Sequence, residues 1–295
     1  MRTGRGVGIV IGVLLVASVR AAAQTATDAP DAADGSGSPG SARSLPAALG
    51  REGSRYLSDT IGILESPLHW KGEEWSRAGI LLATIGVVAL EDQRIDTALE
   101  RRRTARTEAV SDAVTPLGSY AGLAISAASL GGGLIFHDDA VRDTGRDALE
   151  AVFLAAGVVS PLVKTVVGRT RPIQGSDGDE FHAFSSAQSF PSGHTAEAFA
   201  VASVFAARSN GWVVPTLAYG LAAGVALARV NDRAHFPSDV LAGAVLGTTI
   251  GRSIVHRHRN AEQPEADWDL VPVPARKGAG LAIRFSIGHA RHGVS

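Results

Sequence analysis

The sequence predicts an all-α protein, a bundle of about six core helices, and three observations carry this prediction. Residues 46–258 consist of long stretches of Ala, Leu, Val and Gly broken by polar turns, with little of the two-residue alternation that is typical of strands. The chain of 295 residues is 45% hydrophobic and 19% charged, a composition typical of a folded domain and not of a disordered chain. Charge-free apolar runs occur over this region at residues 78–90, 113–136, 151–163, 198–207, 209–228 and 240–251.

The N-terminal segment predicts export. Arg2 and Arg5 precede an apolar stretch, and small residues end at Ala23, which is the pattern of a secretory signal peptide over residues 1–23 with an Ala-x-Ala cleavage site. An uncleaved anchor helix is the alternative that this pattern leaves open. Residues 24–45 are rich in Ala, Asp, Gly, Ser and Pro without an apolar period, so we expect a flexible linker there.

The helical domain is expected over residues 46–259. Its last apolar run places Gly243, Gly247 and Gly251 at four-residue steps, which makes a smooth helix face on which a neighbouring backbone packs closely. The basic patch that follows is interpreted as a solvated helix end, where cations complement the helix dipole. This patch consists of Arg252, His256, Arg257, His258 and Arg259.

A C-terminal tail is expected over residues 260–295. The tail contains the segments 269–273 and 281–287, and in the second the apolar residues Leu281, Ile283, Phe285 and Ile287 alternate, so we predict a short β-strand pair in the tail.

Composition excludes several functional classes. Lys and Arg number 28 and Asp and Glu number 29, so a net charge of −1 provides no basic field for a nucleic acid. The chain has no cysteine, which excludes disulfides, thiolate metal sites and cysteine nucleophiles.

Hydropathy leaves the membrane question open at this stage. The mean hydropathy is +0.12, between a soluble domain and a protein made of membrane spans. A bilayer span needs about 20 apolar residues, and only two of the six charge-free runs reach that length. We therefore expect an exported protein of the periplasm or cell envelope, soluble or membrane-associated, and regard an integral membrane protein as the less favoured alternative.

Three clusters place cations and histidines at the ends of apolar helices. Lys164 and Arg171 frame a helix exit that Pro172 terminates, although a cation at a helix C-terminus is also ordinary by itself. Pro191, Ser192, Gly193 and His194 open the next helix, where a serine cap and free backbone N–H groups can face an anion.

The third cluster is Arg229, His235 and Asp239. The four-residue step brings the Asp239 carboxylate towards the His235 imidazole, which would fix the tautomer and leave the other ring nitrogen as an attacking lone pair. Such a pair alone is more often a surface contact. Together, the three clusters predict a site for a tetrahedral oxyanion, with attack from one side and protonation from the other.

In this order, Lys-x6-Arg-Pro, Pro-Ser-Gly-His and Arg-x5-His-x3-Asp resemble the three-part signature of the type 2 phosphatidic acid phosphatases (PAP2), which share a fold with vanadium haloperoxidases. The resemblance covers about residues 150–250. One departure is Ala228, since the family usually has serine before the third-motif arginine.

The resemblance implies a metal-independent phosphatase without a cofactor that acts on a lipid phosphate or a small phosphomonoester. His235 would attack phosphorus to form a phosphohistidine, Asp239 would orient it, and His194 would protonate the leaving alcohol. The phosphate would be bound by Lys164, Arg171, Ser192, Gly193 and Arg229. A vanadate-dependent haloperoxidase and a non-catalytic lipid-phosphate-binding module are the alternatives.

Other candidates are weaker. His182 in the polar loop is interpreted as a solvent-facing histidine. Asp177, Asp179 and Glu180 in the same loop have no accompanying ligand set for a metal. Arg101, Arg102, Arg103 and Arg106 are interpreted as a charged connector, because Glu100 and Glu108 lie beside them.

Overall fold

The computed structural model describes residues 45–185, 188–262, 266–275 and 278–287. The predicted signal peptide over residues 1–23 lies outside the described residues. The predicted linker over residues 24–45 also does, apart from residue 45, where the first described helix begins.

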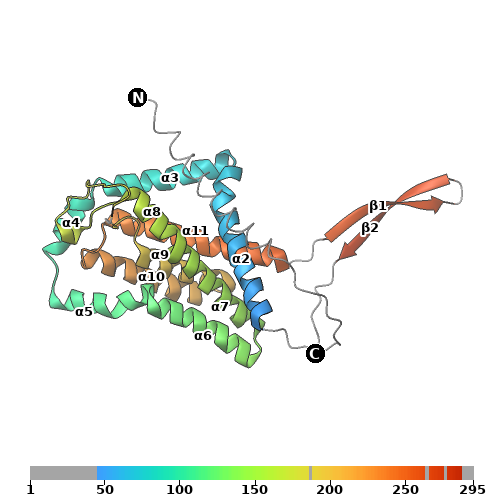
Figure 1. Ribbon diagram of the computed structural model, residues 1–295, viewed down its shortest axis with the longest axis horizontal. Helices are drawn as coiled ribbons and strands as arrows, with labels where there is room; N and C mark the ends of the chain where they lie inside the picture. Colours follow the sequence, from blue (N-terminus) through green and yellow to red (C-terminus); the bar gives the residue numbers. More distant parts are fainter. Residues whose placement is uncertain (1–44, 186–187, 263–265, 276–277, 288–295) are drawn as a thin grey trace.

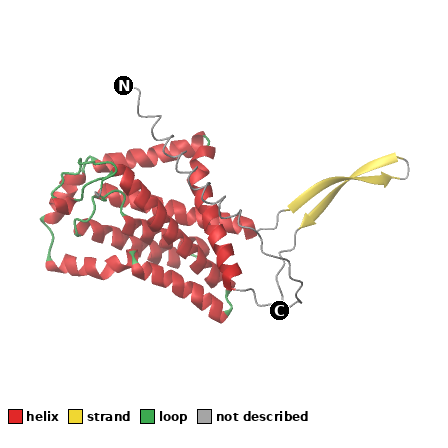
Figure 2. Ribbon diagram, in the orientation of Figure 1, coloured by secondary structure: helices red, strands yellow, loops and turns green. Residues whose placement is uncertain are grey.

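Helices make up almost all of the described chain, as predicted (Figure 1, Figure 2). Each of the six predicted apolar runs is mostly helical, although residues 209–212 precede the helix that begins at Val213. The elements in chain order are α2 (Leu45–Glu65), η1 (Ser66–His69), α3 (Gly72–Ala89), α4 (Asp92–Glu100), α5 (Ala105–Val114), η2 (Thr115–Gly118), α6 (Tyr120–Phe136), α7 (Asp139–Val152), the π-helical η3 (Phe153–Val159), α8 (Ser160–Val167), η4 (Pro172–Gln174), α9 (Gly193–Arg208), α10 (Val213–Asn231), α11 (Pro237–Glu262), β1 (Ala266–Ala275) and β2 (Gly278–Ile287).

Polar residues between the apolar runs set where the helices begin and end. The Thr104 hydroxyl accepts from the Thr107 N–H at 3.2 Å and caps α5, and the Asp138 carboxylate accepts from the Val141 N–H at 3.0 Å and caps α7. Helix α8 ends at Gly168, whose φ of +59° is a left-handed conformation that glycine adopts without steric cost.

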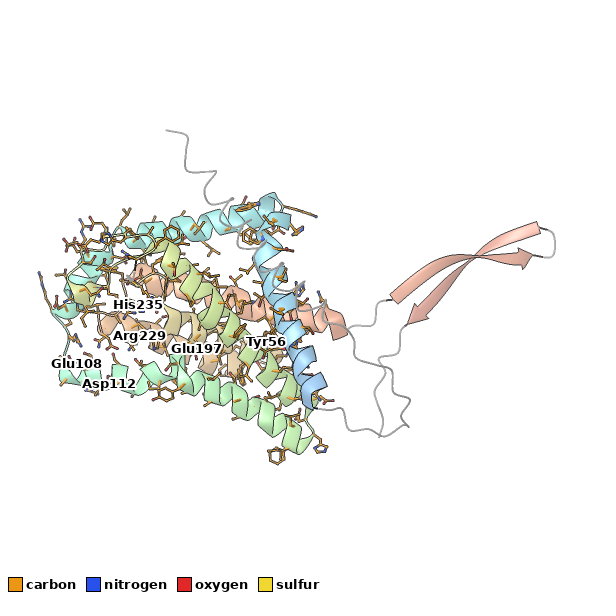
Figure 3. All side chains as sticks on the ribbon, viewed as in Figure 1. Tyr56, Glu108, Asp112, Glu197, Arg229 and His235 are labelled. Carbon is orange, nitrogen blue, oxygen red and sulfur yellow. The ribbon has the colours of Figure 1, made fainter. Side chains whose placement is uncertain are left out.

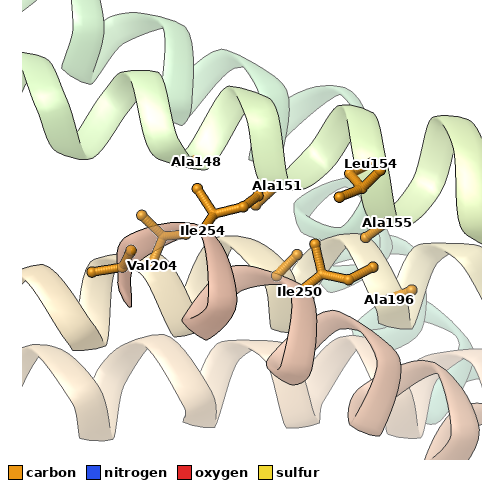
Figure 4. Packing of buried hydrophobic residues seen from close by; sticks show 10 residues of the cluster. Ala148, Ala151, Leu154, Ala155, Ala196, Val204, Ile250 and Ile254 are labelled. Atoms are coloured by element: carbon orange, nitrogen blue, oxygen red, sulfur yellow. The ribbon is translucent and has the colours of Figure 1, made fainter. Parts of the chain in front are cut away.

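The centre of the bundle is the contact between α9 and its neighbours α7 and α11. Small residues of α7 and α9, among them Ala148, Ala151 and Ala196, meet Ile250 and Ile254 of α11, and all five are almost completely buried (Figure 4). Alanine on two facing helices lets their backbones approach closely, so the positions of both helices are strongly constrained.

The glycine face predicted from the sequence lies on this contact. A Cβ atom added to Gly243 would lie 2.5 Å from the Ser192 carbonyl oxygen, and Gly247 and Gly251 face the carbonyls of Ala196 and Ala200 in the same way. The glycines therefore fix the α9–α11 distance at the point where α9 begins.

The C-terminal strand pair predicted from the alternation is present. Strands β1 and β2 pair antiparallel with Ala266 opposite Ile287 and Ala275 opposite Gly278. The strands are longer than predicted, because the pairing runs through Pro272 and Pro274 in β1. The hairpin projects away from the helices (Figure 2).

Two described helices are long and apolar enough to cross a bilayer, namely the 29-residue continuous segment Asp139–Val167 and Val213–Asn231. A third span results if the pair Ala105–Gly118 and Tyr120–Phe136, bent by 43°, counts as one. This corrects the expectation that an integral membrane protein is less favoured. Counting charge-free runs underestimated the length of the helices, because a helix continues through charged residues near its ends.

Exposed apolar side chains agree with this correction. Side chains at least three-fifths exposed include Ile80, Leu82, Val87, Ile135, Phe136, Leu217 and Leu227. Apolar side chains in such numbers on the outside of α3, α6 and α10 are typical of a surface that faces lipid or another apolar partner.

Candidate active site

The three predicted clusters meet at one end of the bundle. Figure 3 shows Arg229 and His235 at the end that α4 occupies, whereas Tyr56 on α2 lies at the opposite end. Helix α8 delivers Lys164 to this end, α9 begins there with Gly193, and the turn from α10 into α11 carries His235.

Lys164 lies beside the first turn of α9. A Cβ added to Gly193 would lie 3.8 Å from Lys164 Cε, and the Lys164 ammonium donates to the Gln188 carbonyl at 2.5 Å. The amino end of α9 and this cation therefore form one electropositive surface, which is the environment that an anion prefers.

Ser192 occupies the predicted N-cap position, but its hydroxyl does not cap α9. The Ser192 Oγ is fully buried and accepts from Thr195 Oγ1 at 3.0 Å, while the Ser192 N–H donates to the Asp239 carbonyl at 3.0 Å. The backbone of the second motif is thus bonded directly to the third motif.

Arg229 has a free donor inside the site. Its Nη2 donates to Thr115 Oγ1 at 2.5 Å and to Asp232. Among the described residues, none accepts from the buried Nε of Arg229. A buried N–H without a partner is costly, so this donor is an observation that favours an anionic ligand.

His235 is 3% exposed and its tautomer is defined by one contact. The Nδ1 atom lies 2.7 Å from the Ser189 carbonyl oxygen, and because a carbonyl only accepts, Nδ1 carries the proton. The Nε2 atom therefore keeps its lone pair. Burial lowers the pKa of His235, and Lys164 and Arg171 act in the same direction, which keeps the ring neutral.

Asp239 is near His235 but is not its direct partner, which differs from the prediction. The His235 Nδ1 and Asp239 Oδ2 atoms are 3.8 Å apart, beyond hydrogen-bond distance. Burial raises the pKa of Asp239, but hydrogen bonding and the Arg169 guanidinium outweigh burial and the pKa is lowered. Asp239 is therefore a buried negative charge beside the imidazole.

His194 is surrounded by positive charge. Burial and the charges of Arg229, His235, Lys164 and Arg171 together lower its pKa to about 4. Arg171 is therefore one of the charges that act on His194. A bound phosphate would offset these cations, and we expect the pKa of His194 to rise when it binds.

The weaker candidates stay outside this arrangement. His182 is exposed, as predicted, and only its backbone contributes, through an N–H that donates to the Gly168 carbonyl at 2.7 Å. Asp177, Asp179 and Glu180 are exposed and form no group with metal-binding spacing among the described residues. Arg103 pairs with Glu108 at 3.0 Å, in agreement with a charged connector.

Four buried residues near the site were not identified from the sequence. Arg169, Asp92 and Ser189 connect to Asp239 through hydrogen bonds. Glu197 lies one helical turn after His194, and burial raises its pKa to about 7. Arg169 and Asp92 are charged residues that lie beside apolar runs, and charges that are buried must be paired. This position was the one signal in the sequence that could have identified them.

A second polar group lies at the opposite end of the bundle, and we call it the polar network. It borders a cavity of about 610 Å³ and joins α2, α7, α9 and α11. Its members are Arg55, Asp59, Asp147, Glu150, Arg208, Arg257 and His258. The prediction that the basic patch is a solvated helix end is therefore partly wrong, because Arg257 and His258 pair with buried carboxylates.

The polar network contains the residues that could hold a metal ion. Ligand atoms of Asp59, Glu150 and His258 lie within 4.8 Å of one another. However, His258 Nε2 lies 2.9 Å from Asp59 and Nδ1 lies 2.7 Å from Asp147, and the Arg55 guanidinium lies within hydrogen-bond distance of both ring nitrogens. Burial lowers the pKa of His258, but the hydrogen bonds to Asp147 and Asp59 outweigh it and raise the pKa to about 9. A protonated imidazole offers no lone pair to a metal.

Sequence comparison agrees with the geometry. The sequence model of the PAP2 superfamily matches residues 146–263, which include all three clusters. The segment is thus similar to the PAP2 superfamily, which confirms the resemblance inferred from the motifs.

Two curated relatives match part of the same chain. The lipid A 1-phosphatase of Porphyromonas gingivalis is 39% identical over 88 residues, which are 28% of this chain and 17% of that protein. The lipid A 1-phosphatase of Rhizobium johnstonii is 33% identical over 103 residues, 31% of this chain and 39% of that protein. The match thus spans well under half the length of either relative.

Among solved structures, a transmembrane PAP2-type phosphatidylglycerolphosphate phosphatase from Bacillus subtilis aligns with a TM-score of 0.48 and 22% identity. The alignment covers 61% of this chain and 94% of that one.

Proposed function

We propose that the protein is a membrane-embedded phosphatase of the cell envelope that hydrolyses a lipid phosphate ester through a phosphohistidine on His235. The observation that carries this proposal is the contact between His235 Nδ1 and the Ser189 carbonyl, because it leaves Nε2 as a nucleophile at the positively charged end of the bundle.

In the first step, the Nε2 lone pair attacks phosphorus and the bond between phosphorus and the ester oxygen breaks. Lys164, Arg171 and Arg229 bind the phosphoryl oxygens, with the Ser192 hydroxyl and the Gly193 N–H, so that the developing charge is stabilised without a metal ion. Protonated His194 donates its proton to the leaving alcohol, which departs neutral.

In the second step, water attacks the phosphohistidine. His194, now neutral, accepts a proton from that water, and the bond between phosphorus and Nε2 breaks. Inorganic phosphate leaves, and both histidines return to their starting protonation states.

An apolar groove beside the site favours a lipid over a small soluble ester. This α5–α10 groove, of about 330 Å³, is lined by Val110 and Val114 of α5 and by Gly224, Leu227 and Ala228 of α10. It ends beside Arg229, which follows Ala228 and bonds to Thr115. An acyl chain in the groove would have its phosphate at the cations. The lipid A 1-phosphatase relatives make lipid A phosphate the first candidate substrate.

The test is phosphate release by the purified chain in detergent, with lipid A phosphate, a polyprenyl diphosphate and a soluble phosphomonoester, each with and without EDTA. We expect activity on the lipid that EDTA leaves unchanged. His235→Gln should reduce kcat by at least about 1,000-fold, whereas the loop variant His182→Gln should match the wild type.

A phosphohistidine trapped by acid-free quenching from the wild type and absent from His235→Gln would support the mechanism. Wild-type turnover in His235→Gln would refute it, and activity lost with EDTA would refute the metal-independent scheme. Halide oxidation with added vanadate, in place of phosphate release, would identify a haloperoxidase. Binding of the lipid without turnover would identify a non-catalytic module.

A further inference from the structure

Arg169 is the largest completely enclosed side chain among the described residues, with 2% exposure. Its guanidinium stacks on the Phe236 ring, with 4.3 Å between Cζ and the ring centroid. It donates to Asp239 Oδ1 at 2.7 Å, to Asp92 Oδ2 at 2.8 Å and to the Gly178 carbonyl at 3.0 Å. A buried charge is tolerated only when it is paired and hydrogen-bonded in this way.

Both oxygens of the Asp239 carboxylate accept hydrogen bonds. Oδ1 accepts from Arg169, while Oδ2 accepts from the Ser189 hydroxyl at 2.5 Å and from the Phe236 N–H at 2.8 Å. Asp239 makes no direct hydrogen bond to His235, because Oδ2 already accepts two bonds and lies 3.8 Å from His235 Nδ1. It acts on the imidazole through Ser189 instead.

Ser189 joins the arginine, the aspartate and the histidine. Its N–H donates to the Arg169 carbonyl at 2.9 Å, its hydroxyl donates to Asp239, and its carbonyl accepts from His235 Nδ1. Because the backbone and side chain of Ser189 are both held, the direction of its carbonyl is set by Arg169 and Asp239.

Asp92 extends this arrangement to α4. Its carboxylate accepts from Arg169, from the Ser238 N–H at 2.9 Å and from the Ser238 hydroxyl. Asp92 is 1% exposed and is the first residue of α4, more than 70 positions before Arg169 in the chain.

We infer that Arg169 and Asp92 are positioning residues of the active site, which hold Asp239 and Ser189 so that His235 presents Nε2 to phosphorus. Neither residue touches the phosphate; they act through the Ser189 carbonyl. This inference rests on the proposed function in one respect, namely that His235 Nε2 is the atom that attacks phosphorus.

The chain offers a matched control one turn further along α4. Asp96 is also buried and pairs with an arginine, since Arg233 Nη2 lies 2.8 Å from Asp96 Oδ2. The Asp96 contact, however, does not extend to Asp239 or Ser189. Asp92→Asn and Asp96→Asn thus remove equivalent charges from the same helix.

The experiment compares Arg169→Lys, Asp92→Asn and Asp96→Asn with the wild type. Arg169→Lys keeps the charge but loses the planar guanidinium that bridges two carboxylates. We expect Arg169→Lys and Asp92→Asn to lower kcat by about 100-fold with KM nearly unchanged, because a nucleophile displaced by about 1 Å loses that much rate. Asp96→Asn should keep the wild-type kcat, and thermal unfolding of each variant identifies the fraction that is folded.

A second measurement does not depend on turnover. In protein labelled with ¹⁵N-histidine, with the His235 signals assigned through His235→Gln, the ring shifts report which nitrogen carries the proton. We expect an Nδ1–H tautomer in the wild type and in Asp96→Asn, and a mixture of tautomers in Arg169→Lys and Asp92→Asn.

Wild-type tautomer and kcat in the folded Arg169 and Asp92 variants would overturn the inference, as would an equal loss in Asp96→Asn. A wild-type protein that releases no phosphate but shows the expected tautomer changes would refute the proposed function and leave the positioning role standing.

Discussion

Replacing Gly243 by alanine should separate α9 from α11 at the active site. The added Cβ would lie 2.5 Å from the Ser192 carbonyl oxygen, about 0.9 Å short of ordinary van der Waals contact at 3.4 Å. The neighbouring atom is backbone, so no side-chain rotation relieves the contact and the helices must move. Since the Ser192 N–H bonds to the Asp239 carbonyl, this movement reaches the second and third motifs together.

Two effects of opposite sign contribute to the stability of Gly243→Ala. Alanine in a helix gains up to about 1 kcal/mol over glycine, whereas overpacking in a close contact costs about 1–3 kcal/mol. We expect the free energy of unfolding to fall by about 1–2 kcal/mol. A displacement near 1 Å should also lower kcat by about 100-fold.

The matched control is Gly220→Ala on α10, where an added Cβ meets no atom within 4 Å. This variant gains the helix propensity without the contact, so we expect a melting temperature at or above that of the wild type and unchanged kcat. Thermal unfolding and phosphate release are measured in one detergent for all three proteins. If Gly243→Ala has the same melting temperature as Gly220→Ala and the kcat of the wild type, the close α9–α11 contact does not position the site.

Three further outcomes are expected. The raised pKa of His258 means that its contribution to stability is full below about pH 6.5 and is lost as the pH rises to about 9, so the wild type should melt at progressively lower temperature from about pH 6.5 to 9, and His258→Gln should remove this dependence. Gly224→Leu fills the α5–α10 groove and should raise KM for a long-chain lipid phosphate about ten-fold while the soluble phosphomonoester is unaffected; an equal effect of Gly220→Leu would contradict the groove. Because the chain has no cysteine, single cysteines report topology: Asp177→Cys should react with an impermeant maleimide on intact cells, and Lys71→Cys only after lysis.

The helical fold, and the position of the site at the ends of helices, were predictable from local sequence. Apolar runs bounded by capping residues define helices without reference to the rest of the chain, and the helix ends then carry Lys164, His194 and His235 to one place. Family motifs added the roles, which remain proposals until His235→Gln is measured.

Contacts through space were not predictable in the same way. Asp92 and Arg169 are 77 positions apart, and no periodicity relates a residue at the start of α4 to one after α8. The assignment of His235 to Asp239 followed from their four-residue spacing, yet the Ser189 carbonyl, 46 positions away, occupies Nδ1. A backbone acceptor has no sequence signature, so only the folded chain identifies it.

The basic patch is a case in which the sequence predicted solvent exposure and the structure shows buried ion pairs. In the sequence alone, Arg257 and His258 resemble a solvated helix end, because they lie in a run of basic residues after the last apolar run. Their partners Asp59 and Asp147 come from α2 and α7, and these ion pairs attach α2 to the end of the bundle. Helix α2 is thereby held on the side that lies away from the predicted phosphate-binding residues.

This attachment sets a constraint that joins the leader prediction to the orientation of the site. In the segment Asp139–Val167, Asp147 bonds to α2 through Arg55, whereas Lys164 reaches the site, so a crossing by this helix separates α2 from the site by the membrane. A signal peptide cleaved at residue 23 would place α2 on the exported side and the site on the opposite side. An exported site requires α2 to stay inside, and then the N-terminal segment is not a cleaved leader. Labelling of the Asp177→Cys and Lys71→Cys variants decides between these two orientations. The proposed envelope phosphatase requires the orientation in which the site is exported and α2 lies inside.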